Sequence, residues 1–254
     1  MTVQTIDARA NPRGELAIKQ AFEQPQWYLG GTAYNIKIRA ETVQTFLGGK
    51  RFGNILDIGC GNGALSLPFL NPDNRLTLLD QSQSMLQIAR SRVPAVLSSQ
   101  VQTLHADFMQ AKLGEQNFDL IISVGVLAYI ERRDEFIRKI KALLKPGGSV
   151  IIECTDVSHF VSRLVLAYHW LCHSLKPGQM RTVVGSSAKT LAILQELGFE
   201  RCGAYRYSLP LPLLRKLMTQ ELSYKAIRFL FGPPSHNRNA WLGNECIYHF
   251  KSTR

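Results

Sequence analysis

The stretch ILDIGCGNGALSLPFL, residues 55–70, places an apolar run, an acid and three glycines ahead of a second apolar run. The first run predicts a buried strand at 53–58, and the second predicts a helix at 63–70. Glycine tolerates positive φ and lets other atoms approach the backbone, so the turn predicts close contact with a small polar ligand. The N–H groups that open the following helix would favour an anionic group of that ligand.

Strands and helices alternate along the chain on both sides of this turn. Runs such as DLIISVGV, residues 119–126, are apolar without alternation, which is typical of parallel strands covered on both faces. The pattern predicts a doubly wound α/β fold with a mostly parallel, seven-stranded, Rossmann-like sheet. The expected strands are 53–58, 76–80, 101–105, 118–124, 148–154, 200–208 and 245–251, and the expected helices are 34–47, 63–70, 82–92, 132–144 and 186–198.

Two segments, residues 156–186 and 209–244, do not fit the strand–helix alternation. Each follows a strand that runs parallel to the first, so both leave the carboxyl edge of the sheet, where open α/β folds bind ligands. We expect them to pack together as a helical lid over the site. The predicted organisation is an arm and covering helix at 1–50, a ligand-binding core at 51–155, and the end of the sheet with two lid insertions at 156–254.

The basic charge of the chain is concentrated in its C-terminal part. The formal net charge is +11 over 254 residues, and residues 159–254 hold 13 Lys and Arg against 4 Asp and Glu, a net of +9. This excess fits an anionic substrate, a membrane surface or RNA, or it forms a solvated basic face. With no apolar run of about 18 residues and no secretory signal, we expect a cytoplasmic protein. The five cysteines show no C-x-x-C spacing, and no metal site is expected.

Three acids distinguish between the ligands that a glycine turn can bind. GCGNGA also fits the dinucleotide fingerprint, so a nicotinamide or flavin enzyme is an alternative. Asp57 ends the first strand, where its carboxylate would repel a pyrophosphate and attract an ammonium or sulfonium. Asp80 ends the second strand and can accept two hydrogen bonds from a ribose diol. Asp107 follows the third strand and can accept one from an exocyclic adenine amine, with Phe108 as a flat apolar neighbour.

The order ILDIGCGNG, LTLLD, HADF, FDLIISVGVLAYI, LKPGGSVIIE, over about residues 30–155, resembles the class I S-adenosylmethionine-dependent methyltransferases. The resemblance implies an enzyme that uses S-adenosyl-L-methionine, with an antiparallel last strand. In the segment WYLGGTAYNIKIR, it implies that Tyr28 and Tyr34 close over the cofactor and that Arg39 pairs with its carboxylate. The other cofactor contacts that it implies are Asp57, Gly59, Gly61, Gly63, Asp80, Gln81, Met85, Asp107, Phe108, Ser123 and Val124.

The sequence says less about the molecule that accepts the methyl group. The fourth strand leads into SVGVLAYI, without the Asn/Asp-Pro-Pro-aromatic or Pro-Cys stretches of enzymes that methylate nucleic-acid bases. We therefore expect in-line transfer to a small apolar or amphiphilic metabolite, with or without an anionic group. An RNA-modifying or membrane-lipid methyltransferase is the alternative, and a non-catalytic binding module is a third. His169 and His173, at i and i+4, and Tyr129, after the fourth strand, are the candidate catalytic residues.

Overall fold

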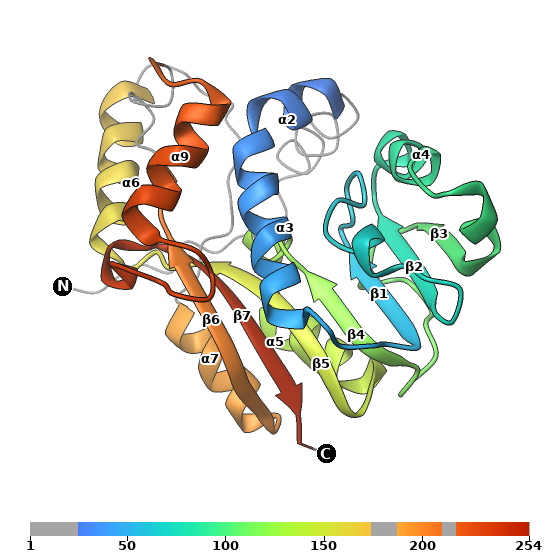
Figure 1. Ribbon diagram of the computed structural model, residues 1–254. Coiled ribbons are helices and arrows are strands. Elements are labelled where there is room, and N and C mark those ends of the chain that lie inside the picture. The colour runs from blue at the N-terminus through green and yellow to red at the C-terminus, as the bar shows by residue number, and fades with distance from the viewer. Residues whose placement is uncertain (1–24, 174–186, 210–216, 254) are drawn as a thin grey trace.

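The computed structural model describes residues 25–173, 187–209 and 217–253, without the side chains of residues 27, 28, 166 and 168–173. Seven strands form one sheet in the order β3-β2-β1-β4-β5-β7-β6 (Figure 1). β7 runs antiparallel to both of its neighbours, so the predicted fold class is confirmed. The strands are β1 (Asn54–Ile58), β2 (Arg75–Asp80), β3 (Val101–His105), β4 (Phe118–Ser123), β5 (Leu144–Thr155), β6 (Phe199–Tyr207) and β7 (Glu245–Ser252).

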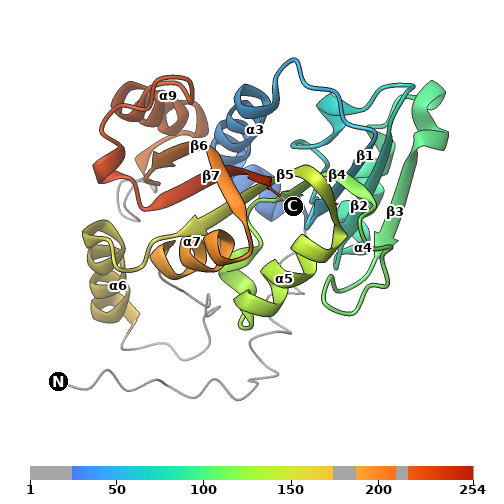
Figure 2. The same cartoon turned by 90° about the horizontal axis from the view of Figure 1, so that it is seen from below.

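Helices cover both faces of the sheet, as Figure 2 shows from below, with α3 and α9 on one face and α5 and α7 on the other. One face packs against α3, α4 and α9 through residues such as Ile38, Ala89 and Phe231. The other packs against α5 and α7 through Phe136 and Leu194. The described helices are α2 (Pro25–Gly31), α3 (Ala33–Leu47), α4 (Gln83–Ser91), α5 (Arg133–Leu143), α6 (Phe160–His173), α7 (Ser187–Glu196) and α9 (Gln220–Phe231), with short 3₁₀ turns η1 (Leu67–Phe69), η2 (Ala95–Gln100), η3 (Leu127–Tyr129) and η4 (Ala240–Leu242).

The helix expected at residues 63–70 is wrong. The chain forms successive turns there, and only the 3₁₀ helix η1 follows the glycine turn. Pro68 explains the difference, because it has no N–H to donate to the carbonyl four residues back and its ring clashes with that carbonyl. The N–H groups of Gly63 and Ala64 are bonded within the turn, to Cys60 O and Asn62 Oδ1. The expected helix start, with N–H groups that favour an anion, is therefore absent.

The two insertions beyond the core meet in the described part of the chain. The Asp156 N–H donates to the Asn244 carbonyl at 2.7 Å, and His159 Nε2 lies 2.7 Å from the Trp241 carbonyl. The rings of Phe160 and Trp241 stack with centroids 6.4 Å apart. These contacts join the start of α6 to η4, while the closure of both segments over the site stays a prediction. Among the described helices, none combines the length and apolar composition needed to cross a membrane.

Candidate functional site

The glycine turn after β1 has the backbone that only glycine adopts readily. Gly59, Gly61 and Gly63 have φ of 66°, 52° and 73°, which confirms the conformation expected of this turn. A Cβ atom on Gly59 would lie 2.5 Å from Cγ2 of Val126, whereas one on Gly61 would meet no atom within 4 Å. The turn is therefore packed at Gly59 and open at Gly61, which gives a ligand access to its backbone.

Asp57 is a buried carboxylate at the end of β1, with a relative exposure of 1%. The Ser66 hydroxyl donates to its Oδ2 at 2.5 Å, while its Oδ1 has no hydrogen-bond partner in the structure. Burial raises the pKa of Asp57 to about 7, the nearby charge of Asp80 adds to the rise, and the Ser66 hydrogen bond opposes it. A buried acceptor atom without a donor is costly, so this atom marks a place where a ligand donor fits.

Asp80 ends β2 directly beside the glycine turn. One carboxylate oxygen accepts the Gly61 N–H at 2.8 Å, and the other accepts the Ser82 N–H at 2.9 Å. Burial raises the pKa of Asp80 above its ordinary value, against the effect of these hydrogen bonds. Asp80 thus holds Gly61 in place, and a carboxylate oxygen can accept more than one hydrogen bond.

Asp107 follows β3, at the same edge of the sheet as Asp80 and the glycine turn. Gln81 Nε2 donates to Oδ2 of Asp107 at 2.8 Å, and the Met109 N–H donates to Oδ1 at 2.7 Å. The structure therefore links Gln81 and Asp107 directly, an arrangement that spacing alone does not specify. The three acids of the prediction lie at or just beyond the carboxyl ends of three adjacent strands, β1, β2 and β3.

Several other predicted contact residues are buried. Phe108 packs edge-on against Phe136, with ring centroids 4.9 Å apart, in the core under α5. Met85 is buried on α4, and Val124 follows β4 with little exposure. Ser123, at the end of β4, is fully buried and its Oγ has no partner in the structure. The roles of these residues toward a ligand stay predictions.

Arg39 of α3 reaches the same edge of the sheet but pairs with a protein carboxylate. Its guanidinium is bidentate on Glu153, with contacts of 2.6 Å and 3.0 Å. It also lies against Gly125, after β4, where a Cβ atom would be 3.1 Å from Arg39 Nη1. Tyr34 is buried on the same helix, and Tyr129 lies in η3. The side chains of Tyr28, His169 and His173 lie outside the described residues.

Sequence reasoning missed a polar cluster around Glu153. The Tyr207 hydroxyl lies 2.7 Å from Asn35 Oδ1 and 3.0 Å from Glu153 Oε1. Thr155 Oγ1 donates to Glu245 Oε2 at 2.9 Å. Burial and the charge of Glu153 raise the pKa of Glu245 above its ordinary value. The available signal was an acid near the end of β5 and another at the start of β7, which antiparallel pairing brings together.

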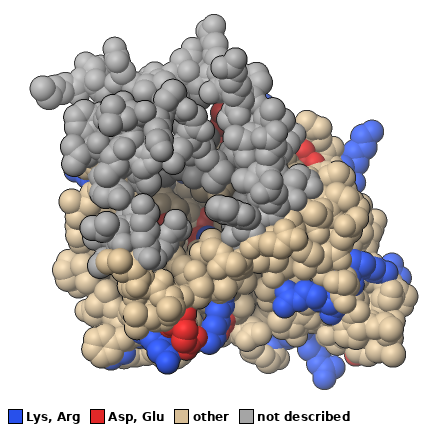
Figure 3. All heavy atoms as spheres, turned by 90° about the horizontal axis from the view of Figure 1, so that it is seen from above, with Lys and Arg blue, Asp and Glu red and all other residues tan. Residues whose placement is uncertain are grey.

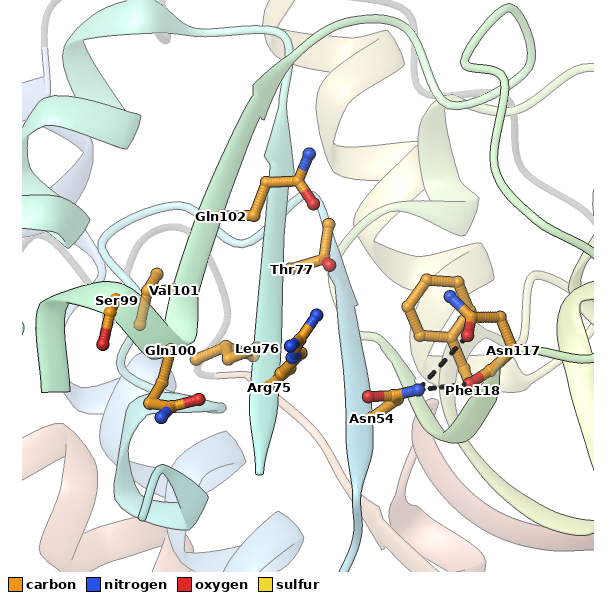
Figure 4. A pocket seen from close by; sticks show the side chains of 10 residues that line it. All are labelled: Asn54, Arg75, Leu76, Thr77, Ser99, Gln100, Val101, Gln102, Asn117 and Phe118. Carbon is orange, nitrogen blue, oxygen red and sulfur yellow. Dashed lines mark hydrogen bonds between the residues drawn. The ribbon is translucent and has the colours of Figure 1, made fainter. Parts of the chain in front are cut away.

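Acidic and basic atoms are visible within a hollow on this side of the molecule (Figure 3). A separate polar hollow of about 360 Å³ lies at the opposite, amino-terminal edge of the strands (Figure 4). Asn54, Arg75 and Val101, which start β1, β2 and β3, line it together with Asn117. It contains none of the predicted site residues, so the carboxyl edge remains the candidate site.

Comparison with known proteins agrees with this geometry. Residues 56–152 match the family model described as a methyltransferase domain. The ubiquinone/menaquinone biosynthesis C-methyltransferase of Pseudomonas entomophila is 31% identical over 111 residues, which cover 42% of this chain and 43% of that protein. The chain therefore spans less than half the length of this relative.

Solved structures share the fold over nearly the whole chain. A methyltransferase from Thermotoga maritima, described as a possible histamine N-methyltransferase, has a TM-score of 0.63 at 17% identity and covers 93% of this chain and 100% of its own. The N-methyltransferase NodS of Bradyrhizobium japonicum, in complex with S-adenosyl-L-homocysteine, has a TM-score of 0.59 at 18% identity and covers 93% and 98%. At these identities the likeness shows the fold alone.

Proposed function

Since the chain belongs to the class I S-adenosylmethionine-dependent methyltransferases, we propose that it transfers the methyl group of S-adenosylmethionine to a small-molecule acceptor. The relatives methylate different atoms by name, carbon in one case and nitrogen in another. The proposal therefore names the reaction and the donor, and leaves the acceptor atom open.

The proposal rests on Asp57, a buried carboxylate with one oxygen that receives no hydrogen bond. Its Oδ1 is buried without a partner, and no described Lys or Arg forms an ion pair with it. The amino group of the methionine half of S-adenosylmethionine is a cationic donor that would satisfy this atom. The open side of Gly61 leaves space for a ligand beside it. The same carboxylate would oppose the pyrophosphate of a dinucleotide, so the residues present fit the methyl donor better.

The remaining cofactor contacts follow from the places of the side chains. Asp80 would accept hydrogen bonds from the ribose hydroxyls, and the Gln81–Asp107 pair would meet the adenine amine. Arg39 would reach the cofactor carboxylate from its place against Gly125. The other residues of this proposed site are Tyr28, Tyr34, Gly59, Gly63, Met85, Phe108, Ser123 and Val124.

The bound donor supplies an activated methyl group on a sulfonium. The work of the chain is to hold an acceptor in line with that methyl group and to exclude water. Tyr129, in η3 beside the end of β4, is a proposed contact of the reacting groups, and His169 and His173 of α6 are proposed proton acceptors. A small apolar or amphiphilic acceptor, with or without an anionic group, fits the aromatic and basic residues of the two insertions.

Calorimetry with S-adenosylmethionine and S-adenosylhomocysteine tests the proposal, with NAD as the competing ligand class. We expect both adenosyl ligands to bind and NAD not to bind. Folded protein that binds neither adenosyl ligand, or that prefers NAD, would contradict the assignment.

The basic C-terminal part supports an alternative acceptor class, RNA or a membrane lipid. RNA binding whose affinity falls steeply with salt would favour the RNA-modifying form. Methyl transfer to lipids extracted from membranes, without transfer to RNA, would favour the lipid form.

A further inference from the structure

Helix α9 is anchored to the rest of the fold by one face. It buries Ile227 and Phe231 against the core, and it packs along α3. Arg228 of α9 forms an ion pair with Glu41 of α3, and the Tyr224 hydroxyl donates to the same carboxylate at 2.8 Å. These contacts fix which face of α9 points inward, and hence which face points to solvent.

The opposite face of α9 is also apolar. Phe229 has a relative exposure of 82% and Leu222 of 51%, and Leu230 is exposed beside them. Positions 222, 226, 229 and 230, with an exposed Ala226 among them, lie on one side of a helix. Leu217, just before the helix, is 79% exposed. A surface helix normally turns a polar face outward, so this apolar stripe fits a surface that covers it.

Two cations lie beside the stripe, Lys225 and Arg238. Lys225 is exposed on the outer side of α9, four residues before Phe229, and Arg238 donates to the Phe229 carbonyl at 3.3 Å. Glu221 is the acid of this outer side among the described residues of α9, and it lies 3.6 Å from Lys225. The local charge is thus positive, in agreement with the net charge of +9 over residues 159–254.

This combination distinguishes between two possible occupants of the stripe. A second copy of the chain would bring an equally basic face against it, and like charges would oppose the contact. An anionic phospholipid bilayer offers phosphates to the cations and an apolar interior to the side chains between them. We propose that the outer face of α9 docks on an anionic membrane surface, with Leu222 and Phe229 entering the acyl boundary and Lys225 and Arg238 at the headgroups.

Cosedimentation of the full chain with phospholipid vesicles tests this docking surface. We expect binding to phosphatidylcholine vesicles that contain phosphatidylglycerol to be at least about tenfold tighter than to phosphatidylcholine alone, because Lys225 and Arg238 face the headgroups. This preference should disappear as salt is added, since exposed charges are screened. Phe229→Ser should weaken binding by about tenfold or more, because a buried phenyl ring contributes roughly that factor.

Matched variants separate docking from general effects. Val96→Ser removes a similarly exposed side chain, 87% exposed, from η2 beside β3, and should bind as the unaltered protein does. Lys225→Glu should weaken binding to the anionic vesicles, whereas Lys189→Glu on α7, at the opposite face of the sheet, should not. All four variants should keep their thermal midpoint and their affinity for S-adenosylhomocysteine.

Two results would overturn the proposal. The first is equal vesicle binding by Phe229→Ser and Val96→Ser. The second is concentration-dependent self-association in analytical ultracentrifugation that Phe229→Ser abolishes while vesicle binding is unchanged, which would assign the stripe to a second copy of the chain.

Discussion

Buried carboxylates are treated differently at two corners of the same sheet edge. At the β1–β2 corner, formed by the glycine turn with Asp57 and Asp80, no described Lys or Arg forms an ion pair with either acid. At the β5–β7 corner, formed by Arg39, Glu153, Thr155, Tyr207 and Glu245, a guanidinium neutralises Glu153.

The difference separates an acid that keeps an acceptor atom for a ligand from an acid that is compensated within the fold. Glu153 has its charge compensated within the fold, because its oxygens accept from Arg39 and Tyr207. Asp57 keeps an acceptor atom without a donor, and burial raises its pKa. A carboxylate in that state is expected to gain from a cationic ligand, whereas Glu153 is expected to hold α3 onto the sheet.

The largest effect on stability is expected from breaking the Arg39–Glu153 ion pair of the β5–β7 corner. Glu153→Leu leaves the Arg39 guanidinium, 14% exposed, without its carboxylate. We expect a loss of about 3–5 kcal/mol in the free energy of unfolding, because an uncompensated charge remains buried. Urea unfolding measures it. Glu135→Leu is the matched control, since it breaks the exposed Arg132–Glu135 pair and should cost less than about 1 kcal/mol. Equal losses would show that the β5–β7 corner is not a structural anchor.

The second effect is on ligand binding at the β1–β2 corner. Asp80→Ala removes the acceptor of the Gly61 N–H and the proposed acceptor of the ribose hydroxyls. Affinity for S-adenosylhomocysteine should fall by about 1–3 kcal/mol, as measured by calorimetry. Asp73→Ala, in the exposed loop before β2, is the control and should bind normally. A variant at Asp80 with unchanged affinity would remove this residue from the proposed site.

Much of the fold could be predicted because its signals are local. Apolar runs bounded by turn residues give β1 and β2 at 54–58 and 75–80, within one residue of the expected spans. The helix expected at 63–70 does not form, because an apolar run alone takes no account of Pro68 within it. The lesson is that an internal proline outweighs a short apolar repeat.

The two corners of the sheet edge also differ in how far the sequence could predict them. The shared place of Asp57 and Asp80 at one edge of the sheet could be predicted, because parallel strands bring their carboxyl ends to the same edge. The β5–β7 corner could not, because its partners are distant in the chain. Arg39 and Glu153 are 114 residues apart, and Asn35 and Tyr207 are 172 apart. Their meeting depends on how α3 sits on β5 and on the register of β6 with β7, which no single stretch of sequence specifies.

A pH titration of binding sharpens the contrast between the corners. Because the pKa of Asp57 is raised to about 7, this carboxyl is protonated below that pH and ionised above it. A cationic ligand favours the ionised form, so the dissociation constant of S-adenosylhomocysteine should rise by roughly tenfold for each pH unit below about 7. Calorimetry in buffers of different ionisation enthalpy should show proton release on binding.

Asp57→Asn is the matched variant for this titration. It keeps the size of the side chain and cannot ionise, so its affinity should be weaker at pH 8 and nearly independent of pH. If the unaltered protein binds equally well at pH 5 and pH 8, Asp57 does not meet the cationic group of the ligand.

The smallest effect is expected from removing a second ion pair, which lies near the β5–β7 corner. Arg206 of β6 contacts Asp156 at 3.3 Å, but these side chains are 30% and 17% exposed, more open than Arg39 and Glu153. Arg206→Met keeps much of the aliphatic stem and should lower the free energy of unfolding by less than about 1 kcal/mol, since water screens the pair. Urea unfolding beside Glu153→Leu gives the comparison directly. A loss at Arg206 as large as that at Glu153 would mean that position at the sheet edge, and not burial of the charge, decides what an ion pair contributes here.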